Sequence, residues 1–240
     1  SSSTDSRPIR LAIATCAAIP GIHADDQLLV TALNELGVQS TPCIWTDPAI
    51  DWASFDAVLI RTPWDYFQRY AEFLAWLDRL PIPTVNDNAL LRWNSDKRYL
   101  LELQARGIAT IPTELIAGTE LGRCLPLQPG REIVVKPTVS GGAWHTVRGV
   151  VGDPAFAAAV QRLQMEFDYL VQPLIPEVVS VGEWSLLYFG GEFSHAVLKR
   201  PASGDFRVQV QFGGSEVMLD PGPALRASAE AVLEATAACG

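Results

Sequence analysis

Hydrophobic and polar positions near the start of the chain follow two patterns, one typical of buried strands and one typical of helices. Residues 9–15 form a near-continuous apolar run, which predicts a strand buried on both faces. Residues 26–36 place apolar side chains at helical spacing, and Gly37 follows as a helix-ending residue. This alternation predicts a parallel α/β sheet whose binding edge lies at the carboxyl ends of its strands. Further strands are expected at residues 38–45, 57–61 and 84–86, and a second helix at residues 67–80.

The pattern changes near residue 94 to short strands joined by glycine turns. Helices are expected at residues 96–105, 154–165 and 224–238. Gly190 and Gly191 separate two of the expected strands, which is typical of a two-residue hairpin. We therefore expect an α+β region with antiparallel strands after the parallel α/β region. The strands expected in this second region cover residues 132–136, 146–151, 169–172, 184–189, 192–200 and 206–212.

The composition is that of a folded chain with an acidic balance. The 240 residues are 48% hydrophobic and 19% charged, with 18 basic against 27 acidic residues and a net charge of −9. These values exclude disordered and collagen-like chains. The longest basic clusters are the adjacent pairs Lys97–Arg98 and Lys199–Arg200, whereas a nucleic-acid surface needs larger clusters. We therefore expect no nucleic-acid partner.

The four cysteines are widely spaced and form no Cys-x-x-Cys pair, so neither a zinc site nor a disulfide framework is indicated. This usage fits a reducing compartment, and we expect a cytoplasmic protein. Residues 11–22 imitate a short secretory segment, but Pro20 and Gly21 end the run as a strand-to-loop turn would. No apolar run approaches the roughly 20 residues of a membrane span, so no membrane partner is expected.

Only three lysines stand against fifteen arginines, so each lysine raises the question of what a compact ammonium does there. Phosphate binding is one answer, and solvated surface charges are the other. Lys136 ends an expected strand, and Ser140, Gly141, Gly142 and Ala143 follow in the next turn. Glycines at a hairpin tip let backbone amides close over an anion, although an ordinary hairpin would have the same sequence.

Two later segments also offer polar groups on strands. Pro173 interrupts the apolar strand at residues 169–176, so this strand is expected at a sheet edge or between lobes. Backbone groups left free beside Leu174 and Ile175 would suit an adenine ring. Residues 204–214 alternate strictly and place Arg207 with two glutamines on one face, as either a solvated surface or the wall of an anion site.

Taken in order, these segments resemble the ATP-grasp superfamily, in the branch of the prokaryotic glutathione synthetases. The resemblance covers nearly the whole chain. It is carried by residues 94–97, 135–137, 140–142, 171–175, 204–207 and 213–214. Residues 64–66, 92–94 and 191–197 are most similar to the smaller group that includes the cycloserine-forming ligase.

The resemblance implies a parallel α/β pre-ATP-grasp lobe at residues 1–93, followed by a two-lobed ATP-grasp fold with a central or lid lobe at residues 94–168 and a C-terminal lobe at residues 169–240. It also implies an ATP-dependent carbon–nitrogen ligase that uses ATP and magnesium. A carboxylate-like group of a small amino-acid-derived substrate would become an acyl phosphate, which an amine or similar nitrogen would attack. The nitrogen would belong to a second molecule or, in a cyclisation, to the same one. A homo-oligomer is compatible with this class.

The same resemblance assigns roles to individual residues. Arg207 would act on the phosphoryl group during its transfer, and Glu183 would take the ribose hydroxyls. The other residues expected at the ATP site are Lys97, Lys136, Ser140, Gly141, Gly142, Ala143, Gln172, Pro173, Leu174 and Ile175. The residues expected at the substrate site are Arg61, Trp64, Asp65, Tyr66, Lys199, Gly213 and Gly214.

The magnesium ligands of the family, an Asp on one strand and a Glu-x-Asn on the next, lie beyond the helix expected here at residues 224–238. Glu216, Asp220, Glu230 and Glu234 are expected on turns or on that helix. The metal ligands and the last strands are therefore expected beyond Gly240. If they are missing, the alternative is a non-catalytic nucleotide-binding or regulatory protein on the same fold.

A Rossmann-type dinucleotide enzyme is a third class. It needs Gly-x-Gly-x-x-Gly after the first strand, and residues 17–20 are Ala-Ala-Ile-Pro instead. The sequence therefore disfavours it.

Overall fold

The computed structural model describes residues 7–125, 130–202, 207 and 213–237. These residues divide into two compact units, one that ends at Ser95 and one that begins at Asp96. The three-part division expected from the sequence stays a prediction.

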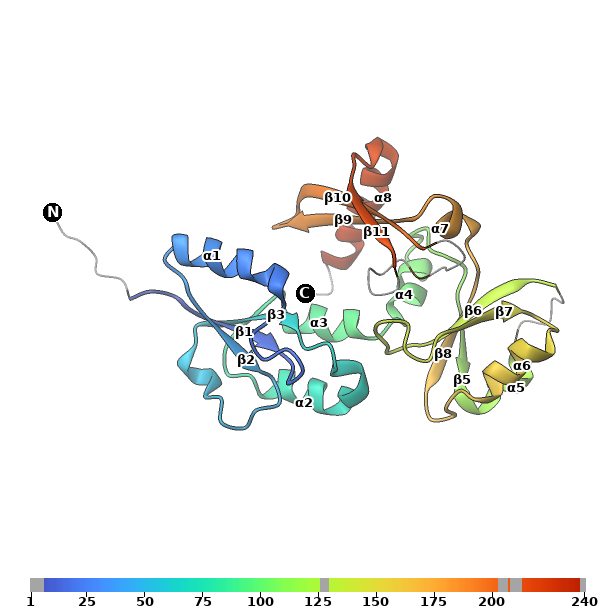
Figure 1. The fold of residues 1–240 in the computed structure, drawn as a ribbon, viewed down its shortest axis with the longest axis horizontal. Coiled ribbons are helices and arrows are strands. Elements are labelled where there is room, and N and C mark those ends of the chain that lie inside the picture. Colours follow the sequence, from blue (N-terminus) through green and yellow to red (C-terminus); the bar gives the residue numbers. More distant parts are fainter. Residues whose placement is uncertain (1–6, 126–129, 203–206, 208–212, 238–240) are drawn as a thin grey trace. The chain divides into compact units, whose positions relative to one another are not determined.

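The first unit is the expected parallel α/β sheet, with strand order β2-β1-β3-β4. Helix α1 lies on one face of this sheet, and α2 and α3 lie on the other (Figure 1). The strands are β1 (Arg10–Thr15), β2 (Gln39–Ile44), β3 (Ala57–Thr62) and β4 (Thr84–Val85). The helices are α1 (Gln27–Glu35), α2 (Tyr70–Arg79) and α3 (Asn88–Ser95), with short 3-10 turns η1 (Ala24–Asp26), η2 (Trp52–Ser54) and η3 (Tyr66–Arg69).

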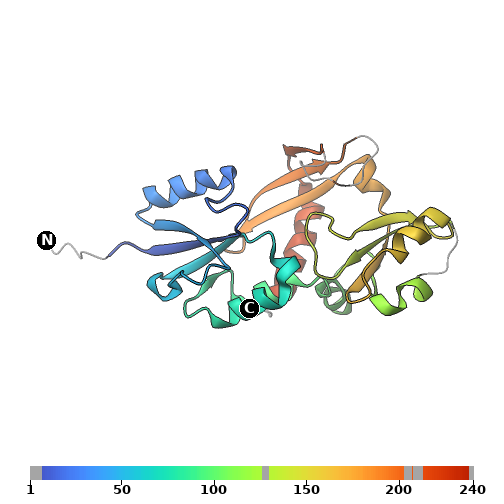
Figure 2. The same ribbon diagram turned by 60° about the horizontal axis from the view of Figure 1, so that its bottom comes forward.

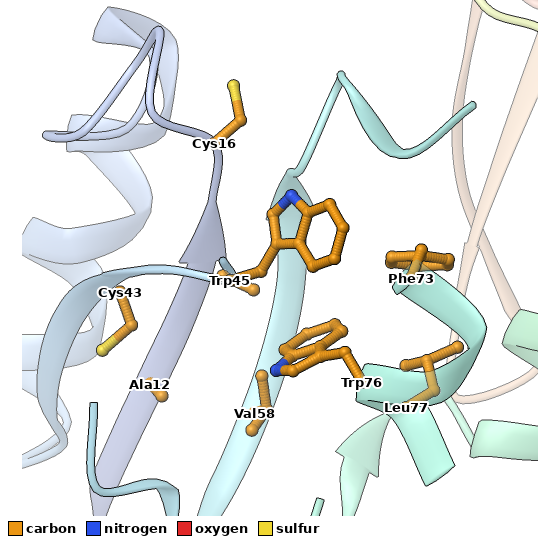
Figure 3. Close-up of a cluster of buried hydrophobic side chains, with 9 residues drawn as sticks. Ala12, Cys16, Cys43, Trp45, Val58, Phe73, Trp76 and Leu77 are labelled. Carbon is orange, nitrogen blue, oxygen red and sulfur yellow. The ribbon is translucent and has the colours of Figure 1, made fainter. Parts of the chain in front are cut away.

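An aromatic core holds α2 against the sheet. The rings of Trp45, Phe73 and Trp76 lie next to one another between the strands and α2 (Figure 3), with centroids 5.7 to 5.8 Å apart. All three side chains are buried, as is Leu77 beside them. Burying rings of this size stabilises a small unit strongly, because apolar area removed from water is the main favourable contribution to folding.

The carboxyl ends of β1 and β3 are tied together by polar contacts. The Thr62 hydroxyl donates to the buried Thr15 hydroxyl over 2.7 Å, and Thr15 in turn donates to the Ile19 carbonyl over 2.6 Å. The Cys16 amide donates to the Thr62 carbonyl. The segment that follows β3, residues 63–66, therefore starts from a rigid strand end.

The second unit contains two antiparallel sheets, as the sequence predicts. The larger has strand order β5-β8-β6-β7. Helices α5 and α6 cover its core face, where Phe156 of α6 packs with the strand residues Ile133 and Tyr169. The smaller has order β11-β10-β9, and Gly190 and Gly191 close its first hairpin with positive φ angles. The strands are β5 (Glu114–Ala117), β6 (Glu132–Pro137), β7 (Val147–Val150), β8 (Asp168–Pro173), β9 (Glu183–Phe189), β10 (Glu192–Arg200) and β11 (Ser215–Met218). The helices are α4 (Tyr99–Ala105), α5 (Leu121–Cys124), α6 (Pro154–Gln161), α7 (Pro176–Ser180) and α8 (Gly222–Thr236), with η4 (Gly118–Glu120).

Two sequence predictions about this unit are wrong. Strand β8 is not an edge strand, because it pairs with both β5 and β6. Pro173 is tolerated because the pairing with β5 stops opposite Val171, and only β6 continues beside the proline. Glu216 does not lie on a turn, because it belongs to β11, which the sequence pattern missed.

The helix expected at residues 96–105 begins later than predicted. Asp96 accepts a hydrogen bond from the Arg98 amide, and this local turn separates α3 from α4. The expected strand at residues 206–212 lies outside the described residues apart from Arg207, which is half-buried and not in a strand.

Two features of the described residues have a bearing on the function. None of the helices there has the length and apolar character needed to cross a membrane. The same residues contain no group of three or more His, Cys, Asp or Glu side chains that could hold a metal ion.

Candidate active site

Lys97 lies in the break between α3 and α4 and is bound to the loop after β6. Its ammonium donates to the Ser140 carbonyl over 2.6 Å and to the Ser140 hydroxyl over 3.2 Å. Its backbone amide donates to the Thr138 carbonyl over 2.8 Å. The break therefore places one lysine at the start of the glycine loop.

Lys136 and Glu183 share this neighbourhood. Lys136 lies on the face of β6 opposite the buried Ile133 and Val135, because side chains alternate along a strand. Burial and, to a smaller extent, the charge of Lys136 together lower the pKa of Lys97 to about 8. Burial also lowers the pKa of Lys136, while the nearby Glu183 carboxylate opposes that shift. Two lysines with weakened proton affinity and one acid are thus within electrostatic range of one another.

The loop between β6 and β7 is tightly folded. Figure 2 shows it as a projection from the end of the sheet β5-β8-β6-β7. Gly142, Ala143 and His145 all have positive φ angles, of 56°, 60° and 50°. Residues other than glycine rarely adopt such angles. Trp144 packs edge-on against Phe167 with ring centroids 5.3 Å apart. Ser140, expected at the ATP site, is buried at the base of the loop, whereas Gly141 to Ala143 form its tip.

The segment expected to hold adenine is partly engaged inside the protein. The buried Gln172 amide donates to the Thr113 hydroxyl over 2.8 Å, and the Leu174 backbone amide donates to the Glu132 carbonyl over 3.0 Å. Pro173 has no amide hydrogen. The Ile175 amide is therefore the next backbone donor of this segment, at the start of α7.

Lys199 lies in a row of alternating charges across the smaller sheet. It is directly opposite Glu183 on β9 and Glu216 on β11, so the three side chains share one face. The other expected substrate residues in this unit, Gly213 and Gly214, lie directly before β11, and Gly213 has a φ of +83°. Arg207 is half-buried and has interaction partners.

The first unit holds a second group of expected residues. Arg61, Trp64 and Tyr66 line a cavity of about 180 Å³ just after β3. The cavity is completed by Ile60, Pro63, Phe73, Leu91, Asn94 and Ser95. Among the four expected substrate residues of the first unit, Asp65 is the one that does not line this cavity. Its carboxylate accepts a 2.8 Å hydrogen bond from the Trp45 indole nitrogen, so it supports the aromatic core instead.

Comparison with known proteins identifies the family of the chain. The family described as D-cycloserine synthetase DcsG, N-terminal domain, matches residues 11–86. The cycloserine biosynthesis protein DcsG of Streptomyces lavendulae is 35% identical over 199 residues, which cover 79% of this chain and 67% of that protein. The chain belongs to the ATP-grasp ligases. The crystal structure of D-cycloserine synthetase DcsG superposes with a TM-score of 0.81 at 31% identity, and the match covers 95% of this chain and 81% of that one.

A more distant ATP-grasp relative is also similar. Glutathione synthetase of Bradyrhizobium diazoefficiens is 27% identical over 192 residues, and the match covers 72% of this chain and 58% of that protein. The resemblance inferred from the sequence is thereby confirmed, as are the fold class and the expectation of a ligase.

Sequence reasoning missed two residues beside the cavity of this ATP-grasp ligase. Asp26 is buried and binds the Arg61 guanidinium. His23 packs against Trp64 with ring centroids 5.5 Å apart. Asp26 is separated from Arg61 by thirty-five positions, so the sequence offers no signal for the contact. The expected helix start at Asp26 was the one local feature that pointed to this position.

Proposed function

We propose that the protein is an ATP-dependent carbon–nitrogen ligase that activates the carboxylate of a small amino-acid-derived substrate as an acyl phosphate. The observation that carries the proposal is the half-buried pair of Lys97 and Lys136, with Glu183 beside them. Two half-buried ammonium groups repel each other and have lost part of their hydration. A polyphosphate offsets both costs, whereas an uncharged ligand offsets neither.

The remaining nucleotide contacts follow from the same neighbourhood. Lys97 and Lys136 bind the phosphates, and Glu183 accepts from the ribose hydroxyls. The backbone of residues 172–175 receives the adenine ring, with the Ile175 amide as its donor, because the Leu174 amide is used by Glu132. Ser140 and the tip residues Gly141 to Ala143 close over the phosphates. A closed loop would exclude water from a reactive acyl phosphate.

The proposed reaction has two steps. A substrate carboxylate oxygen attacks the γ-phosphorus and ADP leaves, while Arg207 stabilises the charge that develops on the transferring group. A nitrogen lone pair then attacks the acyl carbon, and inorganic phosphate leaves with the C–O bonding pair as the nitrogen gives up a proton. The cavity formed by Arg61, Trp64 and Tyr66 is the proposed site for the amino-acid part. Lys199, Gly213 and Gly214 are proposed to contact the substrate in the second unit, and the name of the relative DcsG, a D-cycloserine synthetase, supports a small substrate.

Magnesium is expected to accompany ATP, since it binds phosphate oxygens together with one or two protein carboxylates. The described residues contain no cluster of three or more His, Cys, Asp or Glu side chains suited to a metal. This part of the chain therefore does not fit a protein-built metal centre, and none of its residues is proposed as a magnesium ligand.

ATP binding should be accompanied by proton uptake near pH 8. The pKa of Lys97 is lowered to about 8, so the ammonium is partly deprotonated at that pH. Negative phosphates beside it raise the pKa again, and roughly half a proton per site should be taken up. The uptake should fall away below about pH 7, where Lys97 is already protonated. Calorimetric titration of ATP in two buffers with different ionisation enthalpies measures it.

Lys97→Arg is the matched control, since the guanidinium keeps the positive charge but stays protonated at every pH used. Proton uptake at pH 8 should fall in this variant. If ATP binds the unmodified protein with no proton uptake, Lys97 does not contact the phosphates. If ATP does not bind at all, the proposed function is wrong.

A further inference from the structure

The Arg61 guanidinium is held by one buried carboxylate oxygen. Its Nε and Nη2 donate to Asp26 Oδ1 over 3.0 and 2.5 Å. The Asp26 side chain is only 5% exposed, whereas that of Arg61 is 47% exposed. The pair therefore has a fixed, buried acceptor and a donor that reaches toward solvent.

The contact with Asp26 uses one side of the guanidinium. Arginine carries five N–H donors in a planar fork, and Nε with Nη2 forms its lateral edge. The opposite edge, made of Nη1 and the second hydrogen of Nη2, has no partner among the described residues. That edge has the spacing for two parallel hydrogen bonds to a carboxylate.

The segment that carries Asp26 is itself well fixed. The Thr15 hydroxyl holds the Ile19 carbonyl, and the Ile22 amide donates to the same carbonyl over 3.1 Å. Ile22 is buried at a φ of +62°, which a β-branched residue adopts only where its surroundings enforce it. Asp26 is thus a rigid anchor for Arg61 and not a mobile surface acid.

The surroundings of Arg61 suit a small ligand with an apolar part. Arg61 lines the cavity of about 180 Å³ together with Trp64 and Tyr66. Trp64 is 53% exposed, although its neighbour His23 packs against the ring. A cavity of this size admits a group of a few non-hydrogen atoms.

We propose that Arg61, oriented by Asp26, forms a carboxylate subsite that binds the substrate carboxylate of this ligase before that carboxylate is activated. Asp26 is a positioning residue, because it engages the lateral edge of the guanidinium and leaves the outer edge for the ligand. The inference rests on the proposed function for the identity of the ligand. It predicts that the subsite discriminates a carboxylate from an uncharged amide of the same size.

The test uses D-serine and D-serinamide, which differ only in the carboxyl group. Ligand-observed NMR gives the affinity of the intact protein for each. The protein should bind D-serine roughly tenfold or more tightly than D-serinamide. In Asp26→Asn, the preference should fall by about tenfold, because a neutral amide oxygen holds the lateral edge of the guanidinium less firmly and Arg61 is no longer oriented. Arg61→Lys should also lose preference, since an ammonium lacks the planar fork.

Asp51→Asn is the matched control. Asp51 is an exposed acid that precedes a 3-10 turn in the same unit and makes no capping contact with its side chain. This variant should keep the preference for D-serine. If Asp26 served only to begin α1, Asp26→Asn would lower the melting temperature and leave the ratio of the two affinities unchanged, which would overturn the inference. Arg61→Lys keeps a cation beside Asp26 and covers the case in which Asp26→Asn does not fold.

Titration with ATP separates this inference from the proposed function. A protein that binds ATP with the expected proton uptake but binds D-serine and D-serinamide equally has the proposed nucleotide site and no carboxylate subsite at Arg61. A protein that prefers D-serine but does not bind ATP retains the subsite and loses the proposed ligase function. Failure to bind either serine derivative also overturns the subsite.

Discussion

Replacing Arg207 with alanine should slow substrate-dependent ADP release by about a hundred- to a thousandfold, which corresponds to about 2.7 to 4 kcal/mol of lost transition-state stabilisation. Arg207 is half-buried and has partners within the protein, so its side chain is not a freely solvated charge. The proposed role is to stabilise charge that develops while the phosphoryl group moves. An interaction of that kind lowers the barrier and contributes little to the affinity for resting ATP.

The measurement compares the rate constant of ADP release with the dissociation constant for ATP in the same variant. Arg162→Ala is a suitable control, since Arg162 is an exposed arginine after α6 in the same unit. It should leave both quantities unchanged. A normal rate with weakened ATP binding in Arg207→Ala would assign Arg207 to ground-state binding and contradict the proposed role.

Replacing Lys136 with methionine should weaken ATP binding by roughly 10- to 150-fold, the effect typical of losing a hydrogen bond to a charged group. Methionine keeps much of the apolar side chain and removes the charge. The same change should raise the pKa of Lys97, because the charge of Lys136 helps to lower it. Proton uptake on ATP binding at pH 8 should therefore shrink together with the affinity.

This pairing of two effects separates a local electrostatic role from general damage to the fold. Arg123→Met removes a cation from α5, which packs on the face of the sheet β5-β8-β6-β7 opposite Lys136. This variant should change neither effect. Unchanged ATP affinity in Lys136→Met would show that the phosphates bind elsewhere. A lower affinity without a change in proton uptake would mean that Lys97 and Lys136 do not act on the same ligand.

The elements that the sequence predicted well are those defined by local patterns. Strand β1 is recognisable from its continuous apolar run, and the hairpin at Gly190 and Gly191 from its turn residues. The position of Pro173 was misread because the neighbours of a strand are a tertiary property. Strand β8 is internal, yet the proline lies beyond the end of its pairing with β5.

In the candidate site too, residues with a local sequence signal could be predicted and contacts set by the tertiary fold could not. The scarcity of lysine drew attention to Lys97 and Lys136, and the structure brings their charges within range of each other. The partner of Arg61 could not be predicted, because Asp26 is distant in sequence and resembles an ordinary residue before a helix. The family resemblance assigns Asp65 to the substrate site together with Trp64 and Tyr66, whereas its carboxylate accepts a hydrogen bond from Trp45. Adjacent residues in a loop often point in different directions, and only packing decides which of them reach a cavity.

The transfer of oxygen from substrate to phosphate tests the central claim most directly. The protein is incubated with ATP, magnesium, a nitrogen nucleophile and D-amino acids, D-serine among them, that carry ¹⁸O in the carboxylate. If an acyl phosphate forms, its C–O bond breaks when the nitrogen attacks, and the released phosphate retains one labelled oxygen. Mass spectrometry of the phosphate should therefore detect one ¹⁸O per turnover. Phosphate released without the label would contradict carboxylate activation by this ligase.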